Sequence, residues 1–535
     1  MESRPAPPVP LDEQPSIHDR RWFLLAIMCL SLVLVVMSVA GLNTALPTIQ
    51  RDLGASASDL QWIVDAYSIV FAGLLLSAGA IGDRFGRRRV LLGGLAVFGV
   101  GTLVGGLATG STQLIAGRAV MGVGAAFIMP ATLSIITAIF PPEERTRAIA
   151  IWAGFAGAGS TIGPVVTGAL LEKFWWGSAL LVNVPIVVVI IAAVVTFAPD
   201  SRDETKTPLD PVGALLSLVG LSSLVYGIIQ GPDDGWTSGR VLPAFLIAGV
   251  TLAAFVVWER RSDHPMLPLT LFRDRSFSTG AGVIFIAFLV LFGFFFLFTQ
   301  YLQFARGYSP LEAGLSTLPA AVTLIAVSPR SAALAQRFGA ARVMAAGLGV
   351  VAGGLGVLSR LSPDTPYLVI AAALALLGAG MAITAAPATG QIMTSVPLSK
   401  AGVGSAVNDT SRELGGALGI ALLGTIATSA YRSGIDLSRI RLPAGARAAA
   451  QGSIGAADAI AGRIPGGDAL AAQAASAFTD AFTLVCSISV GVALAAAATI
   501  LVVWRPRREP VVEDTEREAA EVGATLAPVP VRPCP

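Results

Sequence analysis

The chain has 535 residues, of which 54% are hydrophobic and 13% are charged, and its mean hydropathy is +0.73. A soluble domain carries about 25% charged residues, so this chain cannot cover its surface with polar groups and must be solvated by lipid. The formal net charge of +2 gives no indication of a nucleic-acid partner. With three cysteines, two histidines and no Gly-Lys-Ser/Thr sequence, we expect no disulfide framework, no multi-histidine metal site, no P-loop and no enzyme activity.

Hydrophobic segments long enough to cross a bilayer recur along the chain. A helix needs about 20 apolar residues to span the hydrocarbon core, and it satisfies its backbone hydrogen bonds within its own segment. We therefore predict an all-α membrane protein with fourteen transmembrane helices. The predicted spans cover residues 22–42, 60–82, 90–109, 114–138, 148–170, 178–198, 211–230, 241–258, 278–302, 312–335, 342–360, 366–390, 402–428 and 479–504.

Lys and Arg gather in the loops on one side of these spans. With the N-terminus placed in the cytoplasm, the short outer loops hold only Arg51, Lys173, Arg240, Arg306 and Arg360. Cytoplasmic loops carry the excess of basic residues in membrane proteins, so this orientation is favoured and both termini are expected to be cytoplasmic. The Pro-rich start of the chain lacks a basic region and a small-residue cleavage site, so no removed signal peptide is expected.

The loop after the second span has a second copy later in the chain. Residues 78–97 (AGAIGDRFGRRRVLLGGLAV) align without gaps with residues 331–350 (SAALAQRFGAARVMAAGLGV). Two halves related by an axis along the membrane normal are a known transporter plan. The expected parts are a cytoplasmic N-terminal tail (1–21), an N-terminal six-helix half (22–198), two inserted helices (199–262), a C-terminal six-helix half (263–504) with a long outer loop (431–477), and a cytoplasmic tail (505–535).

Several stretches resemble segments of one family, in the right order and at the right spans. GDRFGRRR (82–89) resembles the signature loop of the major facilitator superfamily. LNTALPTIQRDL, LIAGRAVMGVGAAFIMPATL, GSTIGPVVTG and NDTSRELGGALGIALLG resemble segments of its fourteen-span drug:proton antiporter branch. The sequence departs from that branch at Ser38, where many relatives carry an acid, and at Thr167, where the pattern often has glycine.

The resemblance implies a major facilitator fold with two six-helix halves plus two inserted helices. It implies a proton-coupled multidrug efflux transporter that works by alternating access without a cofactor or metal. The expected partners are protons, membrane lipids and small amphipathic, often cationic compounds, and the expected form is a monomer in the inner membrane of a bacterium. Export of a lipid or an endogenous metabolite remains an alternative, and a nutrient symporter is a less favoured one.

Three acidic residues within spans are candidates for proton or substrate binding. Asp65 lies in the second span, and Asp409 and Glu413 lie in the thirteenth with a spacing that places them on one helix face. A charge at the centre of a bilayer costs about 2.5–3.5 kcal/mol on insertion scales, so an embedded acid is a functional candidate. Asp65 could instead reach headgroup water, and Asp409 could lie at the interface. Arg412 is expected to point elsewhere and to need its own partner.

Further candidates are an embedded arginine, a glycine-rich helix and the loop of the repeat. Arg118 in the fourth span needs a carboxylate or carbonyl partner, and the resemblance assigns it to proton coupling, with purely structural pairing as the alternative. The antiporter motif supplies Gly159, Gly163, Pro164 and Gly168, which permit close packing and a bend that changes between states.

We interpret the loop of the repeat (82–89) as a cytoplasmic gate in which Asp83 pairs with an arginine, whereas the simpler interpretation is that the arginines only fix the orientation of the protein in the membrane. The gate residues are Gly82, Asp83, Arg84, Gly86, Arg87, Arg88 and Arg89.

Aromatic residues crowd the ninth span, over residues 285–298. Aromatic walls suit a site for bulky lipophilic cations. Most of these rings are nevertheless expected to face lipid or other helices, with a minority lining a cavity.

Overall fold

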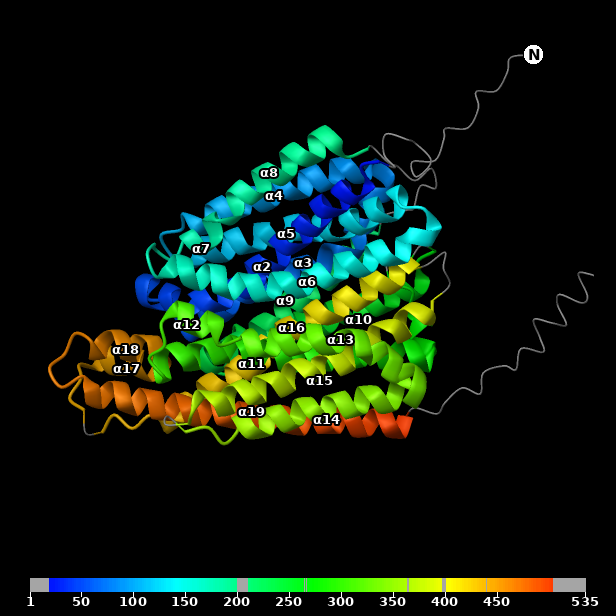
Figure 1. Ribbon diagram of the computed structural model, residues 1–535. Helices are drawn as coiled ribbons and strands as arrows, with labels where there is room; N and C mark the ends of the chain where they lie inside the picture. The colour runs from blue at the N-terminus through cyan, green and yellow to red at the C-terminus, as the bar shows by residue number, and fades with distance from the viewer. Residues whose placement is uncertain are drawn as a thin grey trace, which may run out of the picture.

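The computed structural model describes residues 19–199, 210–263, 265, 267–362, 365–396, 401–438 and 440–503. Within these residues all regular structure is helical and no β-strand occurs (Figure 1). The longer elements are α2 (Arg21–Leu53), α3 (Ala57–Phe85), α4 (Arg87–Gly106), α5 (Ser111–Ile139), α6 (Pro142–Leu171), α8 (Asn183–Phe197), α9 (Pro211–Asp234), α10 (Val241–Arg261), α11 (Arg275–Gln300), α13 (Leu318–Phe338), α14 (Ala340–Leu358), α15 (Tyr367–Thr394), α16 (Ala401–Gly434) and α19 (Asp468–Val503). The shorter ones are α7 (Ser178–Leu181), η2 (Leu269–Arg273), η3 (Tyr301–Ala305), α12 (Pro310–Leu315), α17 (Ala444–Gly452) and α18 (Ile454–Ala461).

Within the described residues, twelve helical segments are long and apolar enough to cross a membrane. They include α7 and α8 taken together and α12 continued into α13, and they do not include α3 or α6. The prediction of an all-helical membrane protein is therefore confirmed, with about twelve candidate spans.

Local sequence signals set the tight connection between α2 and α3. Helix α2 ends at Leu53 because Gly54 adopts a left-handed conformation, with φ of 62°. Helix α3 begins with a capping box, in which the Ser56 side chain accepts from the Asp59 backbone N–H and the Asp59 carboxylate accepts from the Ser56 N–H. The two helices therefore lie antiparallel, with their connection at one end of the bundle.

The helices form two bundles that pack in the same pattern. In the N-terminal bundle (α2–α8), α4 packs on α5, α2 on α6 and α3 on α5; in the C-terminal bundle (α11–α19), α14 packs on α15, α11 on α16 and α13 on α15. Figure 1 shows the first bundle in blue to cyan and the second in green to red. The bundles meet where α3 packs on α16 and where α6 packs on α12 and α13.

The sequence repeat produces the same turn in both bundles. Gly86 between α3 and α4 has φ of 104° and ψ of 123°, and Gly339 between α13 and α14 has φ of 86° and ψ of 136°. Side chains with a Cβ rarely adopt such positive φ values, so glycine is required at both turns. An arginine also lies over the ring of the next residue in each copy, Arg84 over Phe85 and Arg337 over Phe338.

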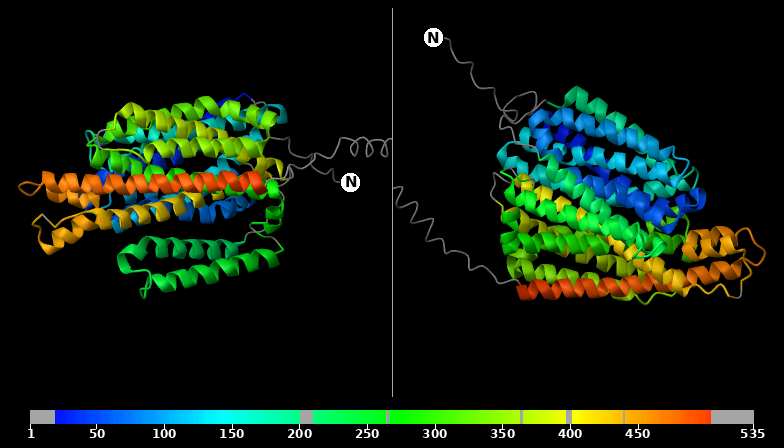
Figure 2. Two further views of the ribbon diagram at one scale, coloured as in Figure 1. Left: turned by 90° about the horizontal axis from the view of Figure 1, so that it is seen from below. Right: turned by 180° about the vertical axis from the view of Figure 1, so that it is seen from behind.

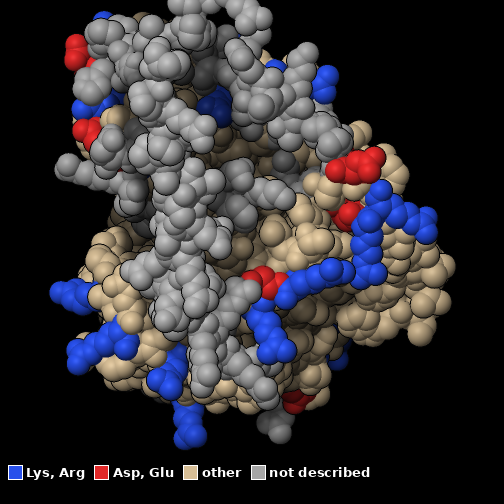
Figure 3. Space-filling model, turned by 90° about the vertical axis from the view of Figure 1, so that its right-hand side faces the viewer, with Lys and Arg blue, Asp and Glu red and all other residues tan. Residues whose placement is uncertain are grey.

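The two ends of the molecule differ. Helix α2 begins and α19 ends at the same end, which we call the tail side, and α17 and α18 project at the opposite end, the loop side (Figure 1). Figure 3 views the tail side, where several Lys and Arg side chains gather around the part that is not described. The segment 431–477, expected to be a loop, instead contains the end of α16, the helices α17 and α18 and the start of α19.

The pair α9–α10 lies on the outside of the two bundles (Figure 2). Helix α9 packs against α3 and α16, one from each bundle, and α10 packs mainly on α9. Asp210 caps α9 by accepting hydrogen bonds from the Gly213 N–H and the Trp258 indole N–H, each at 2.8 Å, which ties the tail-side ends of α9 and α10 together.

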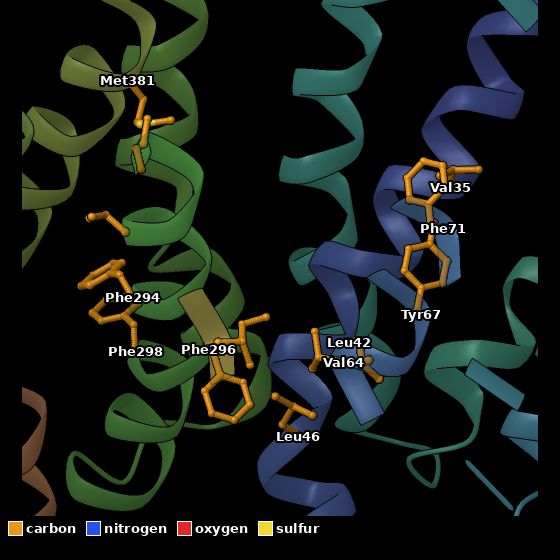
Figure 4. Close-up of a cluster of buried hydrophobic side chains, with 14 of the residues drawn as sticks. Val35, Leu42, Leu46, Val64, Tyr67, Phe71, Phe294, Phe296, Phe298 and Met381 are labelled. Atoms are coloured by element: carbon orange, nitrogen blue, oxygen red, sulfur yellow. The ribbon is translucent and has the colours of Figure 1, made fainter. Parts of the chain in front are cut away.

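A continuous apolar core joins the helices within each bundle. Figure 4 shows part of it, with Val35, Leu42 and Leu46 on α2, Val64, Tyr67 and Phe71 on α3, Phe294, Phe296 and Phe298 on α11, and Met381 on α15. Close backbone approach supports this packing, because glycines on α4 and α5 leave room for the facing helix.

We expect Gly124→Ala to destabilise the folded protein. A methyl group on Gly124 of α5 would lie 2.5 Å from the Phe98 backbone nitrogen and 2.7 Å from the Gly94 carbonyl oxygen on α4, so the two helices would have to separate. Such overpacking costs about 1–3 kcal/mol. The measurement is the thermal unfolding temperature in detergent. Gly93→Ala on α4 is the control, since nothing lies within 4 Å of its added methyl group and its stability should hold or rise.

Candidate functional site

Among the described acids, Asp65 on α3 of the N-terminal bundle is the one most isolated from polar partners. Its side chain is 0% exposed, and neither carboxylate oxygen has a hydrogen-bond partner. It lies one turn from Gln61, which donates to the Ile420 carbonyl oxygen of α16 at 3.3 Å, and one turn from Ile69, which packs against Ala417 and α9. The spacing therefore places Asp65 on the face of α3 that meets the other bundle. The alternative expectation, that Asp65 reaches headgroup water, does not hold in this structure, because its side chain is fully buried.

Arg118 is fully buried on α5 and finds its partners on α3. Its Nε donates to the Ile63 carbonyl oxygen at 3.1 Å, and its guanidinium lies 4.4 Å from the centroid of the Tyr67 ring. Gly122 allows this contact, because a Cβ there would lie 2.5 Å from the Tyr67 carbonyl oxygen. Of the two expected kinds of partner, a carboxylate or a carbonyl, the carbonyl is present, and within the described residues no ion pair joins Arg118 to Asp65.

The acids of α16 are joined by an arginine. Arg412 lies with Nη1 3.6 Å from Asp409 Oδ1 and with Nε 3.4 Å from Glu413 Oε1. The expectation that Arg412 points elsewhere is therefore wrong: its long side chain folds back along the helix between the two carboxylates. Its guanidinium also lies 6.0 Å from the centroid of the Phe288 ring on α11.

Glu413 retains capacity to bind a further group. Its side chain is almost fully buried, and Oε2 has no hydrogen-bond partner. Asp409 is held more firmly, because Asn408 donates to its Oδ1 at 3.3 Å and Thr389 of α15 donates to Asn408 at 2.9 Å. With two carboxylates and one guanidinium, this cluster carries one net negative charge when its acids are ionised.

The Arg118–Tyr67 contact and the acids of α16 belong to different bundles. The packing of α3 on α16 brings the helices that carry Tyr67 and Glu413 together.

The antiporter-motif glycines lie where α6 approaches its neighbours most closely. A Cβ on Gly163 would lie 2.7 Å from the Met37 carbonyl oxygen of α2, and a Cβ on Gly168 would lie 2.7 Å from the Leu311 Cα of α12. Gly159 faces Val36 of α2, and Pro164 lies within α6 beside Gly314 of α12. The motif therefore lets α6 pack closely on α2 of the N-terminal bundle. At the loop-side end of α6, it also allows close packing on α12 of the C-terminal bundle.

Polar contacts between the bundles gather at the loop side. Thr299 and Gln303 near the end of α11 donate to the backbone carbonyls of Asn43 and Thr44 on α2, each at 2.9 Å. We use the term outer clamp for two further contacts between the end of α2 and α17–α18. In the outer clamp, Gln50 donates to Ser453 at 2.6 Å, and Arg51 pairs with Asp458 at 3.0 Å. The loop side is therefore closed in this structure.

The predicted gate residues lie at the α3–α4 turn on the tail side. Gly82 and Gly86 are buried, Arg84 and Arg89 are exposed, Arg87 donates to the Ser134 carbonyl at 3.1 Å, and Arg88 donates to the Val195 carbonyl. The side chain of Asp83 lies outside the described part of the chain, so its pairing with an arginine stays a prediction.

Most aromatic rings of α11 pack between helices, as expected. Phe294 and Phe298 pack around Phe482 of α19, and Tyr301 stacks on the same ring at 4.9 Å. Phe288 and Phe292 are half-buried and face α16, where Arg412 lies near the Phe288 ring and Gly416 lies against Phe292. The two departures from the branch pattern are buried: Ser38 donates to Val35, and Thr167 packs against Gly41.

Three further residues of this site were not identified from the sequence and are recognised only from the structure. Tyr67 covers Arg118, Asn408 holds Asp409, and Gln61 bridges α3 to α16. The available sequence signals are modest, namely the spacing of Gln61 and Asp65 by one turn and the position of Asn408 beside an acid.

The fold and the site define a helical membrane protein made of two similarly packed bundles, with buried ionisable groups where the bundles meet. Residues 28–420 match the Major Facilitator Superfamily, and the chain belongs to this family. The resemblance inferred from the motifs is thus confirmed, and the chain is a membrane transporter and not an enzyme.

Three relatives carry names that describe drug resistance. The chain is 38% identical over 489 residues to the multidrug efflux pump LfrA of Mycolicibacterium smegmatis, which covers 91% of this chain and 97% of that protein. It is 36% identical over 398 residues to the multidrug resistance protein Stp of Mycobacterium tuberculosis, covering 74% of each. It is 33% identical over 454 residues to the methyl viologen resistance protein SmvA of Salmonella typhimurium, covering 83% of this chain and 90% of that one.

Solved structures agree on the fold. A bacterial homologue of the human lysosomal transporter Spinster, crystallised in an inward-facing and unoccupied conformation, superposes with a TM-score of 0.66 and 17% identity. The match covers 92% of this chain and all of that one.

Proposed function

We propose that this protein is a proton-coupled efflux transporter that exports drugs and other amphipathic, often cationic compounds across a bacterial inner membrane. Asp65 carries the proposal: it is a fully buried acid without a hydrogen-bond partner, on the helix face where the two bundles meet. The names of LfrA, Stp and SmvA support the substrate class.

The proposed topology follows the positive-inside rule. Helices α3 and α6, at 29 and 30 residues, are proposed to cross the membrane with the twelve segments above, which gives fourteen spans. The boundaries expected from the sequence then divide the chain into two six-helix halves and the inserted pair α9–α10. The tail side is cytoplasmic, the protein acts as a monomer, and it needs no cofactor.

In the proposed cycle Asp65 binds the proton and Glu413 receives the cation. Burial favours the neutral, protonated form of an acid, so Asp65 takes up a proton in one conformer and releases it in the other, as the water access of the α3–α16 interface changes. Glu413 has one carboxylate oxygen without a partner to offer a lipophilic cation, and Phe288, whose ring lies 6.0 Å from the guanidinium of the neighbouring Arg412, offers an aromatic face. Export follows when the cytoplasmic face closes and the outer clamp opens.

Transport by the purified protein in liposomes tests this proposal. An imposed pH gradient is expected to drive cationic dyes across the membrane, and everted vesicles are expected to show proton movement that depends on the substrate. Transport that is equally fast without a pH gradient, without voltage and at every pH would contradict proton coupling. A susceptibility panel in cells that lack or overproduce the protein separates drugs from an endogenous lipid or metabolite.

Glu413→Gln is expected to weaken export of cationic compounds about tenfold or more and to affect neutral compounds much less. The substitution keeps the shape of the side chain and removes the charge that pairs with the substrate, and charge-assisted hydrogen bonds contribute about 1.5–3 kcal/mol. The measurement is the substrate concentration at half-maximal transport. Asp409→Asn is the comparison, because Asp409 is already bound by Asn408 and Arg412, and it should have the smaller effect. Equal losses for cationic and neutral compounds would argue against this role.

A further inference from the structure

A groove lies on the outside of the molecule, between α3 and the α9–α10 pair, and none of the candidate site residues lines it. Its volume is about 390 Å³, within the range of roughly 300–1,000 Å³ that small-molecule sites occupy. The groove is lined by Trp62, Ser222, Ser223, Tyr226, Arg240, Pro243, Ala244 and Ile247.

The groove runs from the loop side along α9 and α10 towards the middle of these helices. Arg240 lies at its loop-side end, just before α10 begins. Ser222 lies twelve residues before the end of α9 at Asp234, a helical length of roughly 18 Å. Between these ends, the rings of Trp62 and Tyr226 lie 6.2 Å apart. A ligand that fills the groove must therefore have a polar end at the surface and an apolar part that reaches towards mid-membrane.

Three hydroxyl groups in the groove have no protein partner among the described residues. They belong to Ser222, Ser223 and Tyr226. On the same helix pair, Ser217 donates to the Ala214 carbonyl and Thr251 to the Ile247 carbonyl, as hydroxyls in apolar helices usually do. A hydroxyl group in an apolar environment costs free energy unless it is hydrogen-bonded. These hydroxyls therefore point to a ligand with polar atoms below its head, such as the ester groups of a glycerolipid.

The charges at the surface end specify the head group. The Arg240 side chain is 76% exposed, and its only described ion pair is with Asp234, at the long distance of 3.7 Å. Asp233, by contrast, is occupied by Arg432 and Ser58. Arg240 and Asp234 thus present one positive and one negative group side by side, which complements a head group with a phosphate and an amine. A head group with only negative charge would meet Asp234 unfavourably.

We propose that this groove binds a zwitterionic phospholipid of the phosphatidylethanolamine type from the adjacent leaflet. The phosphate accepts hydrogen bonds from Arg240, the ammonium group donates to Asp234, and the ester oxygens accept from Tyr226 and the two serines. One acyl chain lies along Trp62 and Ile247. Because Trp62 lies one turn before Asp65 on α3, the lipid fastens the inserted pair to the helix that carries the buried acid.

Lipid binding to the full-length protein tests this proposal without any assumption about drug export. The purified, delipidated protein is titrated with phosphatidylethanolamine or phosphatidylglycerol of the same acyl chains, and bound lipid is measured by native mass spectrometry together with the thermal unfolding temperature. We expect the wild type to prefer phosphatidylethanolamine, and Arg240→Ala to bind it about tenfold more weakly. Arg360→Ala, at another exposed arginine on the loop side, should bind as the wild type does.

A second variant addresses the deeper part of the groove. The combination of Ser222→Ala, Ser223→Ala and Tyr226→Phe removes the three hydroxyls and keeps the apolar surface, so it should fold normally and bind phosphatidylethanolamine several-fold more weakly. Equal binding of the two lipids by the wild type would overturn the head-group assignment. Wild-type affinity in Arg240→Ala, or the same loss in Arg240→Ala and Arg360→Ala, would overturn the location.

Discussion

Asp65→Asn is expected to reduce proton-driven export to background while the protein remains folded. Asparagine keeps the size of the side chain and cannot exchange a proton, so the step that couples transport to the pH gradient is lost. Stability should hold or rise, because the wild-type carboxylate is completely buried and its oxygens have no hydrogen-bond partner. The amide stays neutral throughout the cycle, so it avoids the cost of about 2.5–3.5 kcal/mol that the ionised form of Asp65 carries inside the membrane.

The measurement is uptake of a cationic dye into proteoliposomes with an imposed pH gradient, beside equilibrium binding of the same dye over the neutral pH range. In the wild type we expect binding to change with pH, and in Asp65→Asn we expect binding to persist without that change. Asp480→Asn is the matched control, since Asp480 is exposed on α19. Wild-type coupling in Asp65→Asn would assign proton binding to another acid.

Gly168→Val is expected to prevent closure of the loop side and to reduce export at least tenfold. Any Cβ at this position lies 2.7 Å from the Leu311 Cα and the Pro310 carbonyl oxygen, so α6 and α12 cannot approach as they do here. The neighbouring atoms are backbone and cannot move aside without displacing a helix. Overpacking of this kind costs about 1–3 kcal/mol, which corresponds to a 5- to 150-fold change in the balance between conformers.

Pairs of spin labels on the loop-side ends of the two bundles would measure this change directly. The distance distribution should shift to longer values in Gly168→Val, and transport should fall with it. Ala169→Val adds a side chain of the same kind at the next position of α6, where the residue is exposed, and should leave both readings unchanged. An unchanged distance distribution in Gly168→Val would mean that this contact does not control closure.

Much of the fold could be predicted from the sequence because the bilayer imposes a length and a composition on each helix. Each of the fourteen predicted ranges overlaps a helix in the described part of the chain, and the repeat around Gly86 and Gly339 marks the matching turn of both bundles. The ends of helices were harder to predict, because a helix can continue into water. Helix α2 extends to Leu53, and α19 begins at Asp468 in a segment rich in alanine that carries no strong hydrophobic signal.

The acids of the candidate site could be found from the sequence because a charge in an apolar span is conspicuous. The partners of the buried ionisable groups could not be found from the sequence. The main partner of Arg118 is the carbonyl oxygen of Ile63, and every residue carries such an oxygen, so no residue type marks it. Arg412 was misplaced because helical spacing describes where Cα–Cβ bonds point, whereas a long flexible side chain can fold back to reach both Asp409 and Glu413.

The outer clamp lies at the loop side of the molecule, at the end of α2 and on α17–α18. In the proposed orientation this places a contact that must break in every turnover on the outside of the cell. A binder that bridges Asp458 and Arg51 would therefore arrest the pump without crossing the membrane and without competing with its cargo. Resistance to such an inhibitor would have to arise in the clamp itself, at residues that play no part in recognising the exported compound.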